Sequence, residues 1–169
     1  MSDAMTHVVL PGTYDPVTLG HLDVIARANR LFAKVTVGVA ASRAKRGTGT
    51  VFSLEERVSM IEESLGEKGI QGVEVLPFEG LLVDFCREVN AGGVVKGLRA
   101  MTDFEFELQQ ADLNAHLAPQ LESVFVMASP EYGYVSSSIV RELASLGASV
   151  DSLVTPSVAD RLRRHYGNK

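Results

Sequence analysis

The sequence has a single cysteine, Cys86, so it cannot form a disulfide within the chain. It also lacks a Cys/His cluster with the spacing of a zinc site. Cys86 lies in the apolar run LLVDFC, which favours a buried thiol over a catalytic one. These scarcities exclude a disulfide framework and a zinc-stabilised domain, and they argue against thiol catalysis.

An excess of positive charge is also missing. The 169 residues include 16 Lys and Arg against 21 Asp and Glu, which gives a net charge of -5. Proteins that grip a nucleic-acid backbone usually present an excess of basic residues, so we expect no nucleic acid partner. A small phosphorylated ligand needs only a few local cations, and an acidic protein can supply them.

Long hydrophobic runs are absent as well. No apolar stretch reaches the length of a membrane span, and the N-terminus shows no signal-peptide pattern of a charged segment followed by an apolar one. We therefore expect no membrane association and a cytoplasmic location. Met5 follows Met1 closely, so residues 1–4 are interpreted as a disordered or alternative start, or a cloning remnant. Residues 1–169 suit one domain with one core.

What the sequence does contain is a regular alternation of short apolar runs and amphipathic segments. The runs predict buried strands and the segments predict helices. The predicted strands span residues 7–10, 34–41, 73–78, 94–97 and 123–128; the predicted helices span residues 20–32, 53–65, 81–89, 102–118 and 136–146, with a last helix from 156. This order predicts a single-domain α/β fold, a doubly wound five-stranded parallel sheet of Rossmann-like type, with ligands at the carboxyl ends of the strands.

Local signals mark several helix ends. Ser53 followed by Glu56 has the capping-box pattern. Gly92-Gly93 predicts the stop of the helix before it, and Pro156 suits the first position of the last helix. The arginines of that last helix are interpreted as a solvated face: Arg161, Arg163 and Arg164.

The segment from Gly12 to His21 joins the first predicted strand to the first predicted helix, where open parallel sheets bind phosphates. Gly12 would let the chain turn sharply off the strand, and Thr13 offers a hydroxyl and a backbone N–H. Gly20 would permit close approach of a phosphate. His21, in the first helical turn, can donate a hydrogen bond to an anion that the helix dipole already favours. A Gly-x-His alone is more typical of an unliganded turn, but ten residues in this order favour a phosphate site.

Three further groups could bind phosphate. Lys96 and Arg99 flank Gly97 near a strand end and could neutralise a phosphate or triphosphate, or lie on a solvated loop. Ser136–Ser138 opens a helix and offers hydroxyls and free N–H groups, although one serine could simply be the N-cap. Lys45 lies in a basic loop and could swing over a bound phosphate or be solvated.

Thr18-Leu19-Gly20-His21 resembles the His-x-Gly-His signature of the nucleotidyltransferase superfamily. Thr in the first position is similar to the phosphopantetheine adenylyltransferases of coenzyme A biosynthesis. The resemblance extends from about residue 8 to 162 and includes three more segments, at residues 52–57, 96–107 and 132–138.

This resemblance implies transfer of the adenylyl group of ATP to 4′-phosphopantetheine, with dephospho-coenzyme A and pyrophosphate as products. The nucleophile is a phosphate that is already negative, so the reaction needs no general base but requires two anions held in line. We assign His21 to the α-phosphate in the transition state and Thr13 to orientation of the attacking phosphate. Lys45 and Lys96 would offset the repulsion between the two anions. Arg99 and Ser136–Ser138 would hold the β- and γ-phosphates.

The resemblance also implies wider binding sets. The ATP set is Thr13, Tyr14, His21, Gly97, Leu98, Arg99, Glu107, Tyr132, Gly133, Tyr134, Val135, Ser136, Ser137 and Ser138, and the acceptor set is Thr13, Lys45, Leu82 and Lys96. Glu107 could equally be an exposed helix charge, and Leu82 a core residue. Kinship further implies a homohexamer and inhibition by coenzyme A. Mg²⁺ is expected to bridge substrate phosphate oxygens rather than sit in an all-protein cage.

Two alternatives remain open from the residues. One is an adenylyl or cytidylyl transferase with another acceptor, such as nicotinamide mononucleotide or glycerol phosphate, although such relatives usually have His at the position of Thr18. The other is a nucleotide-binding regulatory module without turnover, against which the intact Thr13, His21, Lys96 and Arg99 argue. The chain is short and acidic and shows no RNA-binding domain, which argues against an aminoacyl-tRNA synthetase.

Overall fold

A five-stranded sheet forms the centre of the computed structural model, which describes residues 5–41 and 49–167. The strands are β1 (His7–Gly12), β2 (Lys34–Ala40), β3 (Val73–Phe78), β4 (Gly93–Leu98) and β5 (Glu122–Met127). They run parallel in the order β3-β2-β1-β4-β5. The chain therefore winds outward from β1 in both directions, and the crevice between β1 and β4 lies at the switch point where such sheets bind ligands. The predicted fold class is confirmed.

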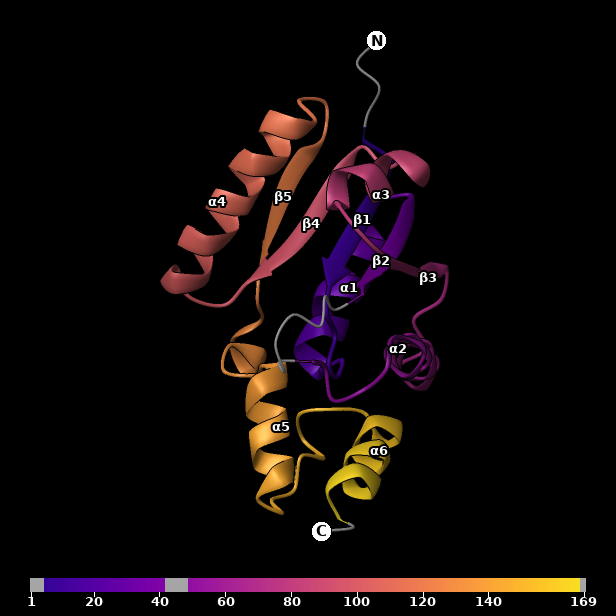
Figure 1. Ribbon diagram of the computed structural model, residues 1–169, viewed down its shortest axis with the longest axis vertical. Helices are drawn as coiled ribbons and strands as arrows, with labels where there is room; N and C mark the ends of the chain where they lie inside the picture. Colours follow the sequence, from indigo (N-terminus) through magenta and orange to yellow (C-terminus); the bar gives the residue numbers. More distant parts are fainter. Residues whose placement is uncertain (1–4, 42–48, 168–169) are drawn as a thin grey trace.

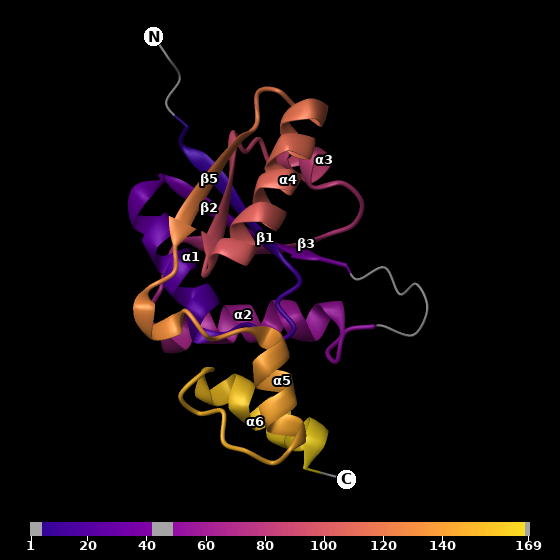
Figure 2. The same cartoon turned by 90° about the vertical axis from the view of Figure 1, so that its left-hand side faces the viewer.

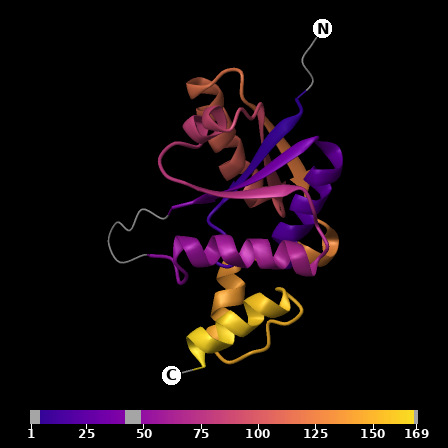
Figure 3. The same cartoon turned by 90° about the vertical axis from the view of Figure 1, so that its right-hand side faces the viewer.

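The helices cover both faces of this sheet and extend below its carboxyl ends. They are α1 (Leu19–Leu31), α2 (Leu54–Glu67), α3 (Leu82–Glu88), α4 (Met101–Leu117), the 3₁₀ turn η1 (Pro130–Tyr132), α5 (Ser137–Ser145) and α6 (Pro156–Tyr166). Helices α3 and α4 lie on the face opposite α1, and α5 and α6 hang below the sheet (Figures 1 and 2). Helix α2 runs between the sheet and α6 (Figure 3). Among the described residues, no helix combines the length and apolarity needed to cross a membrane.

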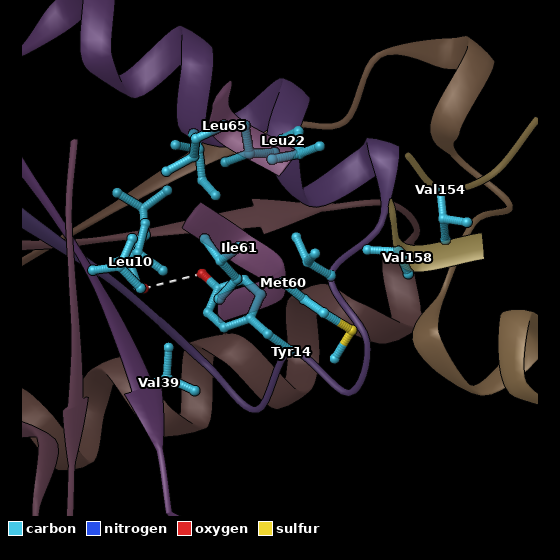
Figure 4. Packing of buried hydrophobic residues seen from close by; sticks show 14 of the residues in the cluster. Leu10, Tyr14, Leu22, Val39, Met60, Ile61, Leu65, Val154 and Val158 are labelled. Atoms are coloured by element: carbon cyan, nitrogen blue, oxygen red, sulfur yellow. Dashed lines mark hydrogen bonds between the residues drawn. The ribbon is translucent and has the colours of Figure 1, made fainter. Parts of the chain in front are cut away.

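Alternate residues of the central strand supply two separate cores. Val8 and Leu10 join the larger core, while Val9 joins a smaller one with Cys86 on the side of α3. Successive side chains of a strand point to opposite faces, so this division shows that both faces of β1 are covered. Figure 4 shows the larger core, which reaches from the sheet through α2 to α6; its labelled members are Leu10, Tyr14, Leu22, Val39, Met60, Ile61, Leu65, Val154 and Val158.

Two of the predicted helix ends are confirmed and one is wrong. Ser53 and Glu56 form the expected capping box at the start of α2, and Pro156 begins α6. The predicted glycine stop after α3 is wrong. Helix α3 ends at Glu88, and Asn90, with φ of 56°, takes the left-handed position. Asn tolerates that conformation because its short polar side chain can bond locally, which leaves Gly93 free to begin β4.

The arginines of α6 divide into two groups. Arg163 and Arg164 are exposed, as the solvated face predicts. Arg161 is partly buried and donates to Ser59 Oγ at 3.1 Å and to Glu63 Oε1 at 2.5 Å, both on α2. The solvated-face interpretation is wrong for Arg161, because packing of α6 on α2 brings its guanidinium against two acceptors. The buried thiol predicted at Cys86 is confirmed.

Candidate functional site

The loop after β1 turns at Tyr14 rather than at Gly12. Tyr14 has a φ of 51°, and its ring folds back over the strand, where its hydroxyl donates to the Leu10 carbonyl at 3.0 Å. A Cβ on Gly12 would lie 2.8 Å from the Tyr14 ring. Gly12 is therefore required for the close approach of this ring, and the expectation that it makes the turn is wrong. The rings of Tyr14 and His21 also meet at a steep angle, with centroids 4.9 Å apart and planes inclined by 72°.

The start of α1 fixes the orientation of His21. Thr18 is the N-cap, and its Oγ1 accepts from the backbone N–H of His21 at 3.3 Å. In return the backbone N–H of Thr18 donates to Nδ1 of His21 at 3.0 Å. This is a capping box with histidine in place of the usual Glu or Gln. A backbone N–H can only donate, so Nδ1 carries the lone pair and the proton of the neutral ring is on Nε2.

Three neighbouring features keep this ring neutral. Burial, followed by the positive charges of Arg99 and Lys96, lowers the pKa of His21 to about 4. Desolvation and like charge both disfavour the imidazolium form. At neutral pH, His21 is thus an uncharged ring that lines the pocket described below and offers Nε2–H as a hydrogen-bond donor.

A pocket of about 340 Å³ opens at the carboxyl ends of β1 and β4. It brings together most of the predicted ATP residues, namely Tyr14, His21, Gly97, Arg99, Glu107, Tyr132, Val135 and Ser136–Ser138, as well as the predicted acceptor residue Lys96. The remaining lining is apolar or small, and includes Leu10, Val24 and Val95. A cavity with apolar walls and a few convergent polar groups is typical of a small-molecule site.

The two cations of the pocket are held by carboxylates of α4. Lys96 Nζ lies 3.4 Å from Glu107, and Arg99 Nε donates to Asp103 at 3.0 Å. Arg99 Nη1 also donates to the Val135 carbonyl at 3.1 Å, which ties β4 to the segment before α5. Both cations therefore face the pocket with defined partners, and Glu107 is an ion-pair partner rather than an isolated surface charge.

The serine segment combines capping with an anion-binding geometry. Ser136 is the N-cap of α5 and accepts from the Ile139 N–H at 3.2 Å, as the simpler alternative predicted for one serine. Ser137 Oγ donates to the Pro16 carbonyl at 2.7 Å, so its proton is already committed. Ser138 Oγ accepts from Arg141 at 3.4 Å. The hydroxyl protons of Ser136 and Ser138 and the N–H groups of the first turn are the donors suited to a phosphate.

Tyr132 covers the start of α1. A Cβ on Gly20 would lie 3.5 Å from the Tyr132 Cβ, an ordinary van der Waals contact, and both residues line the pocket. Ser129, just before η1, donates to Asp23 of α1 at 2.8 Å. Arg27 of the same helix donates to the Met127 carbonyl at 2.6 Å. These two bonds fix the segment that follows β5 against α1.

Several residues that were predicted to belong to the site do not line the pocket. Thr13 is exposed, and its carbonyl accepts a bond from Arg57. Leu98 is buried, and Leu82 packs against the smaller core, as its alternative interpretation expected. Tyr134 is 63% exposed, and neither it nor Gly133 lines the pocket. Lys45 lies outside the described residues.

Sequence reasoning missed three residues that hold the site together. Asp103 stands four residues after Arg99, an ion-pair spacing that the sequence displays. Arg57 is a charge on the buried stripe of α2, beside Met60 and Ile61, and that misplaced charge was a usable signal. Asp15 is 5% exposed and had no signal, because its partners lie far along the chain.

Comparisons with known proteins agree with this geometry. The model of the cytidylyltransferase-like family matches residues 9–143. A phosphopantetheine adenylyltransferase of Moorella thermoacetica is 49% identical over 163 residues, which cover 96% of this chain and 99% of the relative. The phosphopantetheine adenylyltransferase of Thioalkalivibrio sulfidiphilus is 48% identical, covering 94% and 97% of the two chains.

Solved structures show the same fold at much lower identity. A bifunctional NMN adenylyltransferase/ADP ribose pyrophosphatase from Francisella tularensis superposes with a TM-score of 0.72 at 18% identity. The match covers 97% of this chain and 52% of that one, so this chain spans about half the length of the Francisella protein.

Fold, pocket and family model together define the class as a nucleotidyltransferase enzyme with a Rossmann-like fold. Within that class, the sequence relatives share nearly half of their residues with this chain over almost its full length. The chain belongs to the phosphopantetheine adenylyltransferases.

Proposed function

We propose that the pocket between β1 and β4 is where this chain transfers the adenylyl group of ATP to 4′-phosphopantetheine, releasing pyrophosphate and forming dephospho-coenzyme A. Membership of the family supports the reaction, and the capped His21 supports the site. The single observation that carries the proposal is the Thr18 N–H bond to His21 Nδ1, because it presents Nε2–H as a neutral donor in a pocket that also holds Lys96 and Arg99.

The chemistry follows from where donors and charges lie. The oxygen of the acceptor phosphate attacks the α-phosphorus of ATP, and the bond from that phosphorus to the pyrophosphate oxygen breaks. Negative charge grows on the α-phosphate oxygens during this exchange. A preorganised donor such as His21 Nε2–H stabilises it, because the ring is already oriented and costs no reorganisation at that moment. Thr13 would orient the attacking phosphate.

The cations of the pocket offset the repulsion between the two substrates. Lys96 and Arg99 are paired with Glu107 and Asp103, respectively. A polyphosphate offers these cations more negative charge than the two carboxylates do. Arg99, with the N-terminus of α5, would hold the β- and γ-phosphates, and Lys96 would reach the acceptor phosphate. Lys45 is proposed to serve the acceptor as well.

Mg²⁺ is proposed to bind through the substrate phosphates. The acidic lining residues of the pocket, Asp103 and Glu107, are both paired with cations. Across residues 5–41 and 49–167, no group of three or more His, Cys, Asp or Glu could hold a metal ion. This donor set suits an ion carried by ATP, which would neutralise charge on the phosphates. Loss of turnover on chelation and its return with added Mg²⁺ would support this assignment.

Assembly, regulation and location are further parts of the proposal. Helix α4 exposes a series of large apolar side chains in the single chain, Phe104, Phe106, Leu108, Leu113 and Leu117. Exposed apolar patches of this kind usually mark contacts between proteins, which supports a homo-oligomer, proposed as a hexamer.

Coenzyme A is proposed as an inhibitor because it contains the product's adenosine and pantetheine groups. A cytoplasmic location is proposed because the reaction consumes ATP.

The test is pyrophosphate release from ATP and Mg²⁺ with three acceptor conditions. The proposal expects turnover with 4′-phosphopantetheine and none with nicotinamide mononucleotide or without acceptor. Turnover restricted to nicotinamide mononucleotide would overturn the assigned acceptor. ATP binding without turnover in any condition would identify a regulatory nucleotide-binding module instead.

A further inference from the structure

Arg57 is a fully buried arginine that bonds three separate parts of the chain. It lies in the first turns of α2 and is 1% exposed. Its Nη1 donates to the carbonyls of Thr13 at 2.7 Å and Ala40 at 2.9 Å, and its Nε donates to the Phe52 carbonyl at 3.3 Å. These carbonyls belong to the loop after β1, the end of β2 and the segment that leads into α2.

A buried carboxylate completes this arrangement. Asp15 accepts from the N–H of Val51 at 2.9 Å and from the N–H of Phe52 at 3.0 Å. The residue Phe52 is thus held by Arg57 at its carbonyl and by Asp15 at its amide. Burial lowers the pKa of Arg57, and the negative charge of Asp15 opposes that shift. The charge of Asp15 thus partly offsets the burial of Arg57, and Asp15 also lies 3.8 Å from Arg141 of α5.

The position of these bonds separates the two halves of the site. In the sheet, β1 lies between β2 on one side and β4 on the other. The pocket that holds Arg99 and Ser136–Ser138, the groups proposed for the β- and γ-phosphates, lies toward β4. The three carbonyls bound by Arg57 belong to the loop after β1, the end of β2 and the segment that enters α2, and none of these three residues lines the pocket.

We propose that Arg57 is a positioning residue for the acceptor: it fixes the Thr13 peptide at the end of β1 and thereby the place of the attacking phosphate, while ATP binding does not depend on it. This inference rests on the proposed function, in which Thr13 orients the 4′-phosphate. The planar guanidinium suits the role because its donors spread in a fixed fork that reaches three carbonyls at once. A lysine ammonium is a point charge and cannot hold the same three acceptors in the same geometry.

The test is the Arg57→Lys variant, which keeps the charge but not the fork. We expect kcat/KM for 4′-phosphopantetheine to fall by about 10²-fold, the cost typical of a misplaced reacting group. The Kd for ATP, measured calorimetrically without acceptor, should be unchanged. A general loss of structure would weaken the binding of both substrates. A loss confined to the acceptor is therefore a result that a purely structural arginine would not give.

Arg161→Lys is the matched control. Arg161 also donates to α2, through Ser59 and Glu63, but on the side that faces α6. It should change the melting temperature without changing the kinetics of either substrate. A loss of ATP affinity in Arg57→Lys that matches its acceptor loss, or an acceptor loss of the same size in Arg161→Lys, would overturn the inference.

Two further outcomes are decided in the same experiment. If Arg57→Lys does not fold, Asp15→Asn replaces it, because it removes one of the two carboxylate oxygens that hold Val51 and Phe52. A selective acceptor loss in Asp15→Asn supports the inference, and unchanged acceptor kinetics overturns it. A wild-type protein that does not turn over 4′-phosphopantetheine would overturn the proposed function, whereas an active wild type with an unselective Arg57→Lys variant overturns the positioning role alone.

Discussion

At each end of the sheet a histidine lies against a threonine, yet only one of these two histidines is available to a ligand. At the amino end, the Nε2 of His7 lies 2.8 Å from Thr36 Oγ1, and that hydroxyl donates to Glu74 at 3.1 Å. The Nε2 of His7 is therefore bonded within the protein, and backbone hydrogen bonds to Val89 and Asn90 also engage the ring. At the carboxyl end, Nδ1 of His21 accepts from the main chain, and the proton on Nε2 is left for the pocket.

This comparison separates burial from function. The pKa of His7 is lowered by burial and then by Lys34, and the pKa of His21 by burial and then by Arg99 and Lys96. Both rings favour the neutral form, so a depressed pKa alone does not identify the functional one. What differs is which ring nitrogen the protein has already bonded.

The largest expected effect is that of His21→Ala. It removes the Nε2–H donor, so kcat should fall by about 10²–10³-fold, as for the loss of an oxyanion donor. The Kd for ATP should change little, because Arg99 and the start of α5 remain. Steady-state kinetics together with calorimetric ATP binding measure both quantities. A kcat close to that of the wild type would remove His21 from the mechanism.

A smaller effect is expected for Thr18→Ala. The substitution removes the hydroxyl that caps α1 and leaves the backbone bond to His21 Nδ1 in place. The free energy of unfolding should fall by about 1 kcal/mol, and kcat should fall less than in His21→Ala. Urea titrations and kinetics give the two numbers. Thr18→Ser keeps the hydroxyl and should restore both; failure of this rescue would show that the cap does not control His21.

His7→Leu should affect stability and leave catalysis alone. The variant leaves Thr36 without its ring partner, and the free energy of unfolding should fall by roughly 1–3 kcal/mol. Denaturant unfolding measures this change, and kcat should match the wild type. His7→Gln retains a donor amide and should lose less. A large fall in kcat with intact folding would break the distinction between the two ends of the sheet.

The smallest effect concerns pH. Because the pKa of His21 is about 4, its ring signals in NMR spectra should stay level from pH 8 to below pH 6, with the proton on Nε2. The unfolded chain, whose histidines titrate near 6.5, takes up protons first as the pH falls. The stability that the neutral His21 contributes is therefore complete above about pH 6.5 and is lost toward pH 4. A titration midpoint near 6.5 for His21 would contradict its buried, cation-flanked environment.

The sequence predicts the succession of strands and helices along the chain well, because buried strands and capped helices are local patterns. The capping box at Ser53 and the start of α6 are examples that the structure confirms. The Asn90 stop of α3 was missed because several residue types can take the left-handed conformation, and a glycine pair nearby offered a stronger local signal.

The site was predictable only where its residues form a continuous motif. Thr18 and His21 stand three residues apart, so their association follows from the helix start. Arg57 and Asp15 hold segments that meet only after the sheet has formed, and no spacing along the chain encodes that meeting. Tyr14 illustrates a third case: its motif was recognised, but the reversal of the ring over Gly12 depends on a backbone angle that the sequence does not display.

The seclusion of Cys86 has a practical consequence for an enzyme whose proposed acceptor ends in a thiol. The chain's single cysteine is 1% exposed, and burial raises its pKa to about 11. Disulfide exchange requires a thiolate that can reach its partner, and Cys86 meets neither condition. Oxidised pantetheine compounds should therefore leave the protein unmodified, and its activity can be followed without added reductant.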